Sequence, residues 1–280
     1  MNLERYNLKG IEFYKYKNDK TGCFHKVMYY NPDKSDICER LIKDENLTSL
    51  CFSYRFIKND EIVKINFPFN NEITSISIDL ELKNLSFLEQ FRNLKELFIK
   101  DPNKPNLNLA TFKQLKILSC SWSANLNGLE DIDTLEEISL WNFGKEDLRV
   151  LDKNVSLRRI ELVNPKIKSM KGIENLPNLE HIDIEKGKKL EEVESFTTHH
   201  KKMKILRIYG SPNLLKCNSI QHLTNLDVIT FGKVKNLESV NFLNDLKMLS
   251  ICGIHPSNIK VTDNSIELLK SIRSKLSSQY

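Results

Sequence analysis

The sequence has no long apolar run. No stretch holds enough consecutive apolar residues to cross a bilayer, and residues 1–10 lack the apolar centre of a secretory signal. The six cysteines form no C-x-x-C pair, so the sequence indicates neither a disulfide framework nor a zinc site. Scattered cysteines without a signal predict reduced thiols. We therefore expect a cytoplasmic protein that neither enters a membrane nor holds a metal ion.

Signatures of catalysis are missing as well. The sequence contains no G-x-x-x-x-G-K-[ST], G-x-G-x-x-G, H-E-x-x-H or G-x-S-x-G motif. No acid–base pair and no nucleophile stands at a spacing that suggests a mechanism. The sequence thus predicts no enzyme, no catalytic residues and no cofactor.

Charge of one sign is not concentrated in any arm of the chain. The formal net charge of +5 is small for 280 residues, whereas nucleic-acid-binding domains carry a basic stripe or patch. We do not expect nucleic acid as the partner, although weak binding driven by the positive excess stays open as an alternative. The densest basic segment is residues 199–204, which begins with His199 and His200. It predicts a solvated turn, with contact to phosphate or to an acidic partner as the alternative.

What the sequence does contain is one short pattern written many times. The pattern L-x-x-L-x-L, in which another apolar residue can replace leucine, is clearest at Leu179, Met203 and Leu226. Eleven residues after each of these starts stands a further leucine: Leu190, Leu214 and Leu237. A fixed period in the range of about 20 to 50 residues is typical of proteins that coil into stacked repeats.

Copies of the pattern fill most of the chain. They start at Leu47, Ile73, Leu94, Leu115, Leu135, Leu157, Leu179, Met203, Leu226 and Leu246. Alternating apolar positions predict a short strand with one buried face, and a single copy cannot bury its leucines without a neighbour. We predict parallel strands stacked along a coil. Single helical turns, 3₁₀ pieces and extended chain should return along the other side.

Three segments depart from the repeat. Residues 54–70 form an irregular insert, in which residues 62–67 predict an extra strand. Residues 1–46 predict a cap of two strands, 11–17 and 23–30, followed by a short helix with Ile37 and Leu41 on one face.

The end of the chain predicts a closing helix. Asn264 and Glu267 have the spacing of a capping box. The apolar stripe that follows consists of Ile266, Leu269, Ile272 and Leu276. We therefore expect an N-terminal cap at 1–46, a coil of about nine or ten repeats at 47–260, and a C-terminal capping helix at 261–280.

These repeats resemble those of the leucine-rich repeat family, and the resemblance covers residues 47–254. The irregular period of about 22 residues is similar to that of plant disease-resistance receptors and short bacterial leucine-rich repeat proteins. The resemblance implies an α/β solenoid: a right-handed coil with a parallel β-sheet on its concave face, used for recognition and not for catalysis. The usual asparagine, nine places into each repeat, is missing. Asn142 and Asn164 come one place early, so the turns must be satisfied in another way.

Recognition by such a coil depends on side chains that leave the strands on the concave side. Since successive strand residues point to opposite faces, these are the third, fifth and seventh residues of each copy. One predicted group is aromatic: Phe98, Trp122 and Trp141, with Trp122 next to a seventh position. The other is a mixed-charge centre: Glu137, Arg159, Glu161, His181, Asp183, Glu185 and Arg207, with Tyr209 at its far edge. Aromatic and arginine anchors in a polar surround are typical of binding hot spots.

The sequence thus favours a non-enzymatic scaffold, expected to be a monomer, that binds a protein partner of unknown identity through the concave face. A cytosolic inhibitor or immunity protein that blocks a toxin or an enzyme is an alternative, because acidic side chains suit a basic cleft. A purely structural interpretation also stays open. In that case the rings pack against neighbouring strands or a cap, and the charges neutralise one another across strands.

Overall fold

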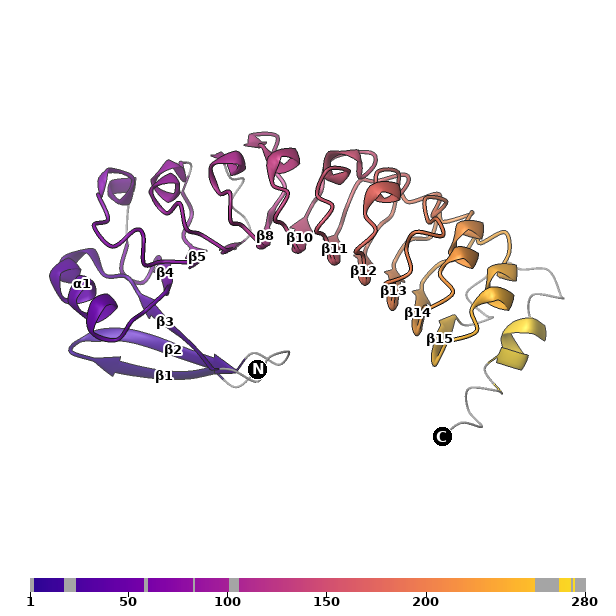
Figure 1. Ribbon diagram of the computed structural model, residues 1–280, viewed down its shortest axis with the longest axis horizontal. Helices are drawn as coiled ribbons and strands as arrows, with labels where there is room; N and C mark the ends of the chain where they lie inside the picture. The colour runs from indigo at the N-terminus through magenta and orange to yellow at the C-terminus, as the bar shows by residue number, and fades with distance from the viewer. Residues whose placement is uncertain are drawn as a thin grey trace. The chain divides into compact units, whose positions relative to one another are not determined.

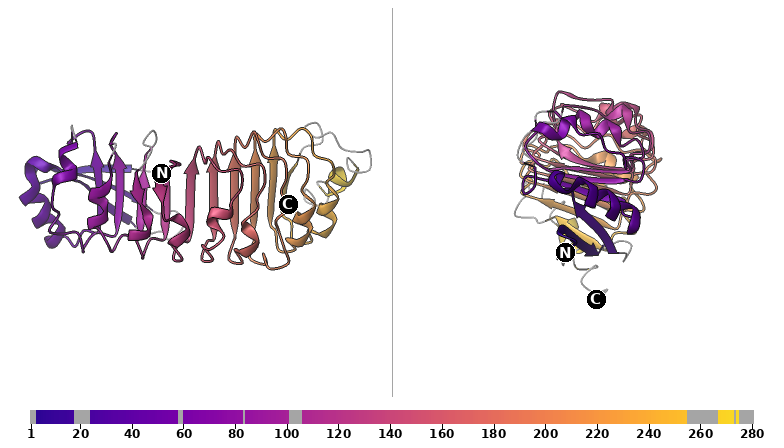
Figure 2. Two further views of the ribbon diagram at one scale, coloured as in Figure 1. Left: turned by 90° about the horizontal axis from the view of Figure 1, so that it is seen from above. Right: turned by 90° about the vertical axis from the view of Figure 1, so that its left-hand side faces the viewer.

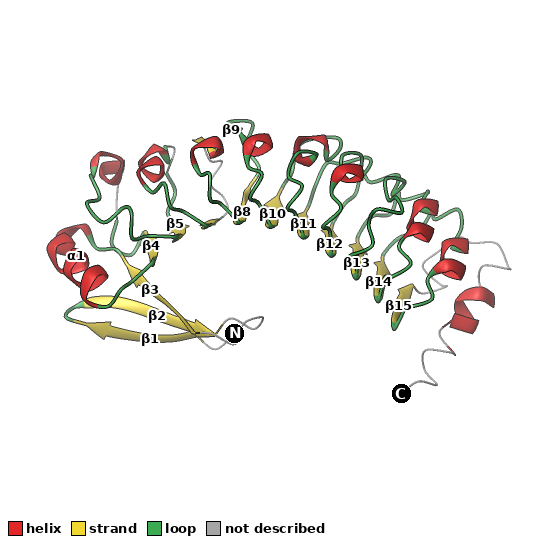
Figure 3. Ribbon diagram, viewed as in Figure 1, coloured by secondary structure: helices red, strands yellow, loops and turns green. Residues whose placement is uncertain are grey.

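The structure is a computed structural model that describes residues 3–17, 24–57, 60–82, 84–100, 106–254, 267–272 and 274. It divides into two compact units, Met1–Gly128 and Leu129–Tyr280. Within each unit the strands lie along one side and the helical turns along the other (Figures 1 and 3). The predicted coil of short parallel strands is confirmed in both units.

The first unit joins an antiparallel start to a parallel continuation. Its elements are β1 Leu3–Leu8, β2 Ile11–Lys17, β3 Phe24–Tyr29, η1 Pro32–Lys34, α1 Ser35–Asp44, β4 Ser49–Ser53, η2 Asp60–Lys64, β5 Ser75–Asp79, η3 Ser86–Gln90, β6 Glu96–Ile99, β7 Leu107–Asn108, η4 Leu109–Thr111, β8 Ile117–Ser121 and β9 Leu126–Asn127, where η marks a 3₁₀ turn. Strands β1, β2 and β3 pair antiparallel. From β3 through β4, β5 and β6 to β8 the pairing is parallel, and β7 pairs with β9 in a second small sheet.

The segment before the repeats contains the two predicted strands and the helix, together with β1, which the sequence analysis did not predict. Helix α1 buries Cys38, Leu41 and Ile42, whereas Ile37 stays partly exposed. Ile37 and Leu41 are one turn apart in this helix, so Ile37 lies at the edge of the buried face. The role of this segment as a cap stays a prediction.

The predicted strand over residues 62–67 is wrong. The segment begins with the 3₁₀ turn η2 and continues without regular structure. Its apolar residues enter a cluster of buried rings, where Phe67 packs against Phe52 with ring centroids 5.6 Å apart. The side chain of Gln90 replaces a neighbouring strand, because it accepts from the Phe67 N–H at 3.1 Å and donates to the Ile65 carbonyl at 2.9 Å.

The buried thiol of Cys120 is expected to make the folded chain less stable at alkaline pH. Its side chain is fully covered, and burial raises its pKa from 9.0 to about 12. Because the folded-state pKa lies above the unfolded one, the folded chain holds the proton more tightly. The corresponding stability is complete below pH 9 and is lost as the pH rises toward 12.

We expect Cys120→Val to reduce the decrease in unfolding free energy that occurs at alkaline pH. Urea midpoints measured at about pH 8 and about pH 10.5 should then differ less for the variant than for the wild type. Valine suits the position because the same place in other copies holds Ile184 or Ile208. An equal alkaline loss in both proteins would show that this thiol does not contribute.

The second unit repeats one strand-and-turn unit without interruption. Its elements are η5 Leu129–Asp131, β10 Glu137–Trp141, η6 Arg149–Leu151, β11 Arg159–Val163, η7 Ile173–Asn175, β12 His181–Glu185, β13 Ile205–Tyr209, η8 Asn218–His222, β14 Val228–Gly232, η9 Asn241–Asp245 and β15 Ile251–Ile254. All neighbouring strands from β10 to β15 pair parallel, and Figure 2 shows them side by side. Residues 267–272 are helical, and Leu269 is buried there. Asn264, Ile266 and Leu276 lie outside the described residues.

The leucine pattern builds the core of this unit. The first, fourth and sixth residues of the copies that form β10 to β14 are buried, as in Leu179, Ile182 and Ile184, which are all 0% exposed. The leucines eleven places after a start are buried as well: Leu190, Leu214 and Leu237. Each strand therefore adds its apolar face to a core shared with both neighbours, as the period predicted.

The turn after each strand is satisfied by main-chain hydrogen bonds. The eighth residue of five successive copies has a positive φ: Asn142, Asn164, Lys186, Gly210 and Lys233. The N–H of Asn142 donates to the Val163 carbonyl at 2.8 Å, and the same bond recurs in the following copies. Asn164 also donates from its side chain to the Asn142 side chain at 2.6 Å. The two asparagines thus occupy the left-handed position, where their side chains are tolerated.

The last copy starts at Leu249, so the predicted start at Leu246 is wrong by three residues. Val228 pairs with Ile251, which makes Ile251 the third residue of its copy. Both leucines are buried. Leu246 occupies the place three residues before the start, where Leu176 and Leu223 stand in other copies, and its apolar side chain therefore imitated a start.

No helix within the described ranges has both the length and the apolar character that spanning a membrane requires.

Candidate functional site

The open face of the second unit is defined here as the third, fifth and seventh residues, counted from the start of each copy, in the copies that form strands β10 to β15. In β10 and β11 these residues are partly exposed while the residues between them are buried. Trp141, Arg159 and Asp183 are all partly exposed, so the predicted facing of these strands is confirmed. The register places the third residues in one row, in which Arg159 pairs with His181 and His181 with Ile205.

A polar chain crosses three positions of the open face. Arg159 Nη1 lies 3.2 Å from His181 Nδ1, and Arg159 Nη2 lies 3.6 Å from Glu161 Oε2. The His181 Nε2 atom lies 3.8 Å from Asp183 Oδ2, which is beyond hydrogen-bond reach. His181 was expected to point outward. It does lie on the open face, but its neighbours leave it only 9% exposed.

The arrangement fixes the tautomer of His181. A guanidinium can only donate, so Nδ1 accepts from Arg159 and the ring proton resides on Nε2. That Nε2–H is buried and has no hydrogen-bond partner in the described part of the chain. A buried donor without an acceptor is unusual in folded proteins. His181 therefore holds an unused donor next to an acidic side chain.

Two further side chains of the charged centre have unused capacity. The Asp183 carboxylate receives no hydrogen bond from any described residue, and the nearest described side-chain nitrogen is His181 Nε2 at 3.8 Å. Arg207 pairs with Asp183 in the strand register, but its exposed guanidinium makes no ion pair within the described ranges. Glu185 differs, because Lys186 Nζ lies 3.1 Å from its carboxylate. The charges neutralise one another only in part.

Trp141 ends strand β10 at the seventh position. Its neighbour in register is Val163, and its side chain is partly exposed. Among the described residues its indole has neither a hydrogen-bond acceptor nor a ring contact. Glu137 begins the same strand and is also partly exposed.

Tyr209 lies over the neighbouring strand. A Cβ atom added to Gly232 would stand 2.4 Å from the Tyr209 ring, so the ring occupies the space that a side chain would need. Lys233 Nζ lies 5.1 Å from the ring centroid, and its contact with Tyr209 raises the pKa of Lys233 above 10.5. Tyr209 remains 44% exposed. The ring is thus partly structural, as the alternative interpretation of the sequence proposed.

Phe98 and Trp122 belong to the first unit, whereas Trp141 belongs to the second. Phe98 lies in β6 between Ser77 and Ser119 and is partly exposed. Trp122 directly follows β8 and is also partly exposed. The predicted aromatic group of all three residues stays a prediction.

The sequence analysis missed the apolar part of the open face. Ile205, Val228 and Ile251 form one row in register, and Ile251 is 51% exposed. The run of apolar third positions after His181 was the signal that could have revealed this row. The wrong start of the last copy hid Ile251.

His200 corrects the interpretation of residues 199–204 as a solvated turn. Its ring is 1% exposed, and its Nδ1 accepts from the Thr197 N–H at 3.0 Å. The proton is therefore on Nε2, which donates to the Ile173 carbonyl at 2.9 Å. His199 is exposed, as are Lys201 and Lys202.

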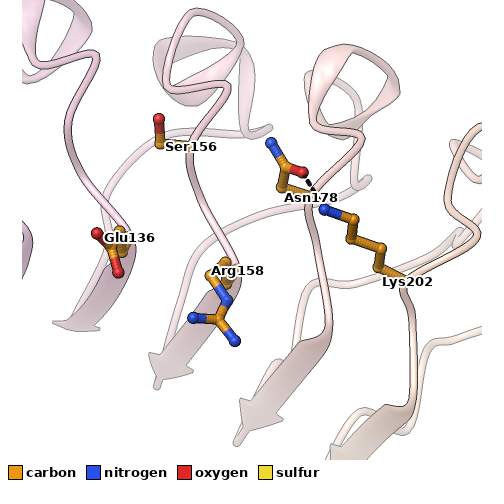
Figure 4. A pocket seen from close by; sticks show the side chains of 5 residues that line it. All are labelled: Glu136, Ser156, Arg158, Asn178 and Lys202. Carbon is orange, nitrogen blue, oxygen red and sulfur yellow. Dashed lines mark hydrogen bonds between the residues drawn. The ribbon is translucent and has the colours of Figure 1, made fainter.

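A shallow depression of ≈ 290 Å³ lies over the segments that precede strands β10 to β13 (Figure 4). Its lining residues are Glu136, Ser156, Arg158, Asn178 and Lys202. Lys202 donates to Asn178 at 2.8 Å, and Arg158 holds Glu180 through two hydrogen bonds of 3.0 and 2.9 Å. These groups satisfy one another across successive copies, which indicates a role in stacking the repeats. No group of three or more metal-ligating side chains occurs in the described part of the chain.

No protein-family model matches the sequence, and no curated protein does either. Similar solved structures include internalin C2 of Listeria monocytogenes, which is 17% identical over 69% of this chain and 82% of its own, with a TM-score of 0.49. The plant peptide hormone receptor RGFR1, solved in complex with RGF2, is 12% identical over 76% of this chain and 43% of its own, with a TM-score of 0.41. The functional domain of InlJ from Listeria monocytogenes is 13% identical over 80% and 56%, with a TM-score of 0.40. At these identities the likeness concerns the fold alone.

Proposed function

Because this chain is built as a leucine-rich repeat coil, we propose that it is a non-enzymatic scaffold that binds a protein partner on the open face of its second unit. The observation that carries the proposal is Trp141, whose partly exposed indole has no partner among the described residues. Trp is among the residues most enriched in binding hot spots. Asp183 and Arg207 supply unused charge on the same face.

The dimensions of this face support the proposal. Six parallel strands, β10 to β15, stand side by side in the second unit. At about 4.8 Å between neighbours they form a row of roughly 25 Å. A row of that width suits an interface of ordinary size.

Trp141→Ala tests the proposal. We expect the variant to keep its thermal midpoint, because the ring is partly exposed, and to weaken partner binding by about 2 kcal/mol or more. The partner is first captured with the intact chain and identified by mass spectrometry. Its affinity for wild type and variant is then measured with purified proteins.

The matched control is Val155→Ala, which truncates another exposed apolar side chain, 46% exposed and outside the strands. It should bind as the wild type does. Equal affinity of Trp141→Ala and wild type would remove Trp141 as an anchor. Unfolding of Trp141→Ala would show instead that the ring is structural.

An inhibitor of a toxin or enzyme is the second candidate, because four carboxylates and only two guanidinium groups occupy the strand positions of this face. The carboxylates belong to Glu137, Glu161, Asp183 and Glu185. Such a surplus suits a basic cleft. The captured partner distinguishes the two functions: an inhibitor abolishes a catalytic activity of the partner at equimolar ratio, and a general scaffold does not.

We place the protein in a reducing compartment as part of the same proposal. Among the described residues Cys38, Cys51, Cys120 and Cys217 are buried and unpaired. Burial raises the pKa of Cys51 to about 12, so this thiol stays protonated near neutral pH. The cysteines therefore serve as small core residues.

A further inference from the structure

The open face changes character between β12 and β13. Strands β11 and β12 carry Glu161, Asp183 and Glu185, whereas the third residues of the next three strands are Ile205, Val228 and Ile251. Adjacent strands lie about 4.8 Å apart, so the acidic and the apolar parts adjoin. One partner segment can cover both.

The apolar row is covered at Val228, which is 8% exposed, partly exposed at Ile205, and open only at its last member. Ile251 is 51% exposed at the third position of β15. Next to it the fifth position holds Gly253, whose missing side chain is replaced by the Thr230 side chain leaning from β14. The exposed part of the Ile251 side chain is therefore the surface on which an aliphatic or aromatic side chain of a partner can lie. Exposed apolar surface with a polar border is typical of an interaction site.

The acidic part contains two groups that lack their natural partners. Asp183 receives no hydrogen bond within the described ranges, although its side chain is only 29% exposed. Beside it the buried Nε2–H of His181 has no acceptor in the part of the chain that the structure describes. A carboxylate prefers a cationic donor, and an N–H prefers a carbonyl oxygen. A polypeptide segment with a lysine or arginine supplies both.

We infer that the partner presents a short segment in which a lysine or arginine stands beside an aliphatic or aromatic side chain. The cation binds Asp183, whose carboxylate has no lysine or arginine partner among the described residues. The apolar side chain packs on the row of Ile205, Val228 and Ile251. As Asp183 turns toward the cation it uncovers His181 Nε2, which donates to a main-chain carbonyl of the segment. This inference rests on the proposed function and specifies its partner.

Charge complementarity favours this partner over an acidic one. Arg207 is exposed and makes no ion pair with any described residue, so a carboxylate or phosphate would be attracted to it. It stands, however, directly beside Asp183 in the register, on a face with twice as many carboxylates as guanidinium groups. An anion would meet net repulsion there.

The test uses the intact chain and a random dodecapeptide library displayed on phage. Enriched peptides are synthesised, and their affinities are measured by fluorescence anisotropy for wild type, Asp183→Asn, Ile251→Ser and Arg207→Ala. We expect the enriched peptides to combine basic with aliphatic or aromatic residues. Asp183→Asn and Ile251→Ser should each weaken binding about tenfold. Raised salt should weaken wild-type binding more than that of Asp183→Asn.

Arg207→Ala is the comparison of opposite sign, because it removes a positive charge beside Asp183. It should bind basic peptides more tightly than the wild type does. The inference fails if acidic peptides are enriched. It also fails if the Asp183→Asn, Ile251→Ser double variant enriches the same peptides equally well, or if both single variants bind them with unchanged affinity. Thermal midpoints of all variants exclude unfolding as the cause. If the captured protein partner depends on Trp141 but not on Asp183 or Ile251, the proposed function stands and only this inference fails.

Discussion

Replacing Leu206 by alanine is expected to lower the free energy of unfolding by about 2–5 kcal/mol. Leu206 is the fourth residue of its copy in β13 and is 0% exposed. It stands in register between Ile182 and Ile229, so its side chain fills the core between two neighbouring strands. Truncation removes apolar contacts and leaves a cavity that the rigid strands on both sides cannot close.

Urea unfolding followed by far-ultraviolet circular dichroism measures this loss. The matched control is Leu215→Ala, which makes the same chemical change at a leucine that is 37% exposed. We expect the control to cost less than about 1 kcal/mol, because its side chain loses little buried area. A loss at Leu206 no greater than at Leu215 would mean that the leucine ladder is not the continuous core described above.

The ladder could be predicted from the sequence because it depends only on local alternation repeated at a regular period. The same alternation predicted the facing of Trp141, Arg159 and Asp183, which requires no knowledge of the neighbouring copies. The pattern failed where an apolar residue has another origin. Leu246 satisfies the pattern, yet it belongs to the turn before the strand, and nothing in the local sequence distinguishes the two places.

Contacts between copies could not be predicted from one copy alone. The Tyr209 ring lies over the neighbouring strand because Gly232 in that strand has no side chain to exclude it. The strand-like segment 62–67 is held by the Gln90 side chain, which lies 23 residues after Phe67. One sequence feature could have revealed contacts between copies: an asparagine directly before the start of a copy. Asn178 and Asn225 each stand there, and each donates from its side chain to a carbonyl of the preceding copy at 2.9 Å.

The candidate site was predicted in part for the same reason. Which residues lie on the open face could be predicted from the strand alternation. Which of them form hydrogen bonds or ion pairs depends on distances between neighbouring strands. The sequence could not show that Arg159 orients the His181 ring, or that Asp183 is left without a donor. The apolar row was not predicted as part of the site, because Ile205 and Val228 have neither a charge nor a ring that would mark them as anchors.

The second large effect is expected at Asn154, a polar residue where most other copies have an apolar one. It stands three places before the start of its copy and is 0% exposed. Its side-chain amide donates to the Leu129 carbonyl at 2.9 Å and to the Ile132 carbonyl at 2.6 Å. In the copies that start at Leu157, Leu179, Met203 and Leu226, the carbonyl at the place of Ile132 accepts from the first residue of the strand pattern, as Leu176 accepts from Leu179. Within the described residues no such main-chain donor reaches Ile132.

Asn154 therefore replaces a turn bond of the preceding copy. We expect Asn154→Ala to cost about 3 kcal/mol, because two buried carbonyls lose a donor and a cavity forms. Urea unfolding measures the loss.

Asn154→Leu separates the two causes, since Leu176 and Leu223 fill the same place in later copies. Leucine restores the packing but not the donor, so about 1–2 kcal/mol of the loss should remain. If Asn154→Leu recovers the full unfolding free energy of the wild type, the effect comes from packing alone. If Asn154→Ala is as stable as the wild type, Asn154 does not bridge the two copies. His200 provides the comparison within the chain, because it occupies the same place two copies later and its ring donates to the preceding turn in the same way. If Asn154→His retains more stability than Asn154→Leu, the donated hydrogen bond holds these copies together.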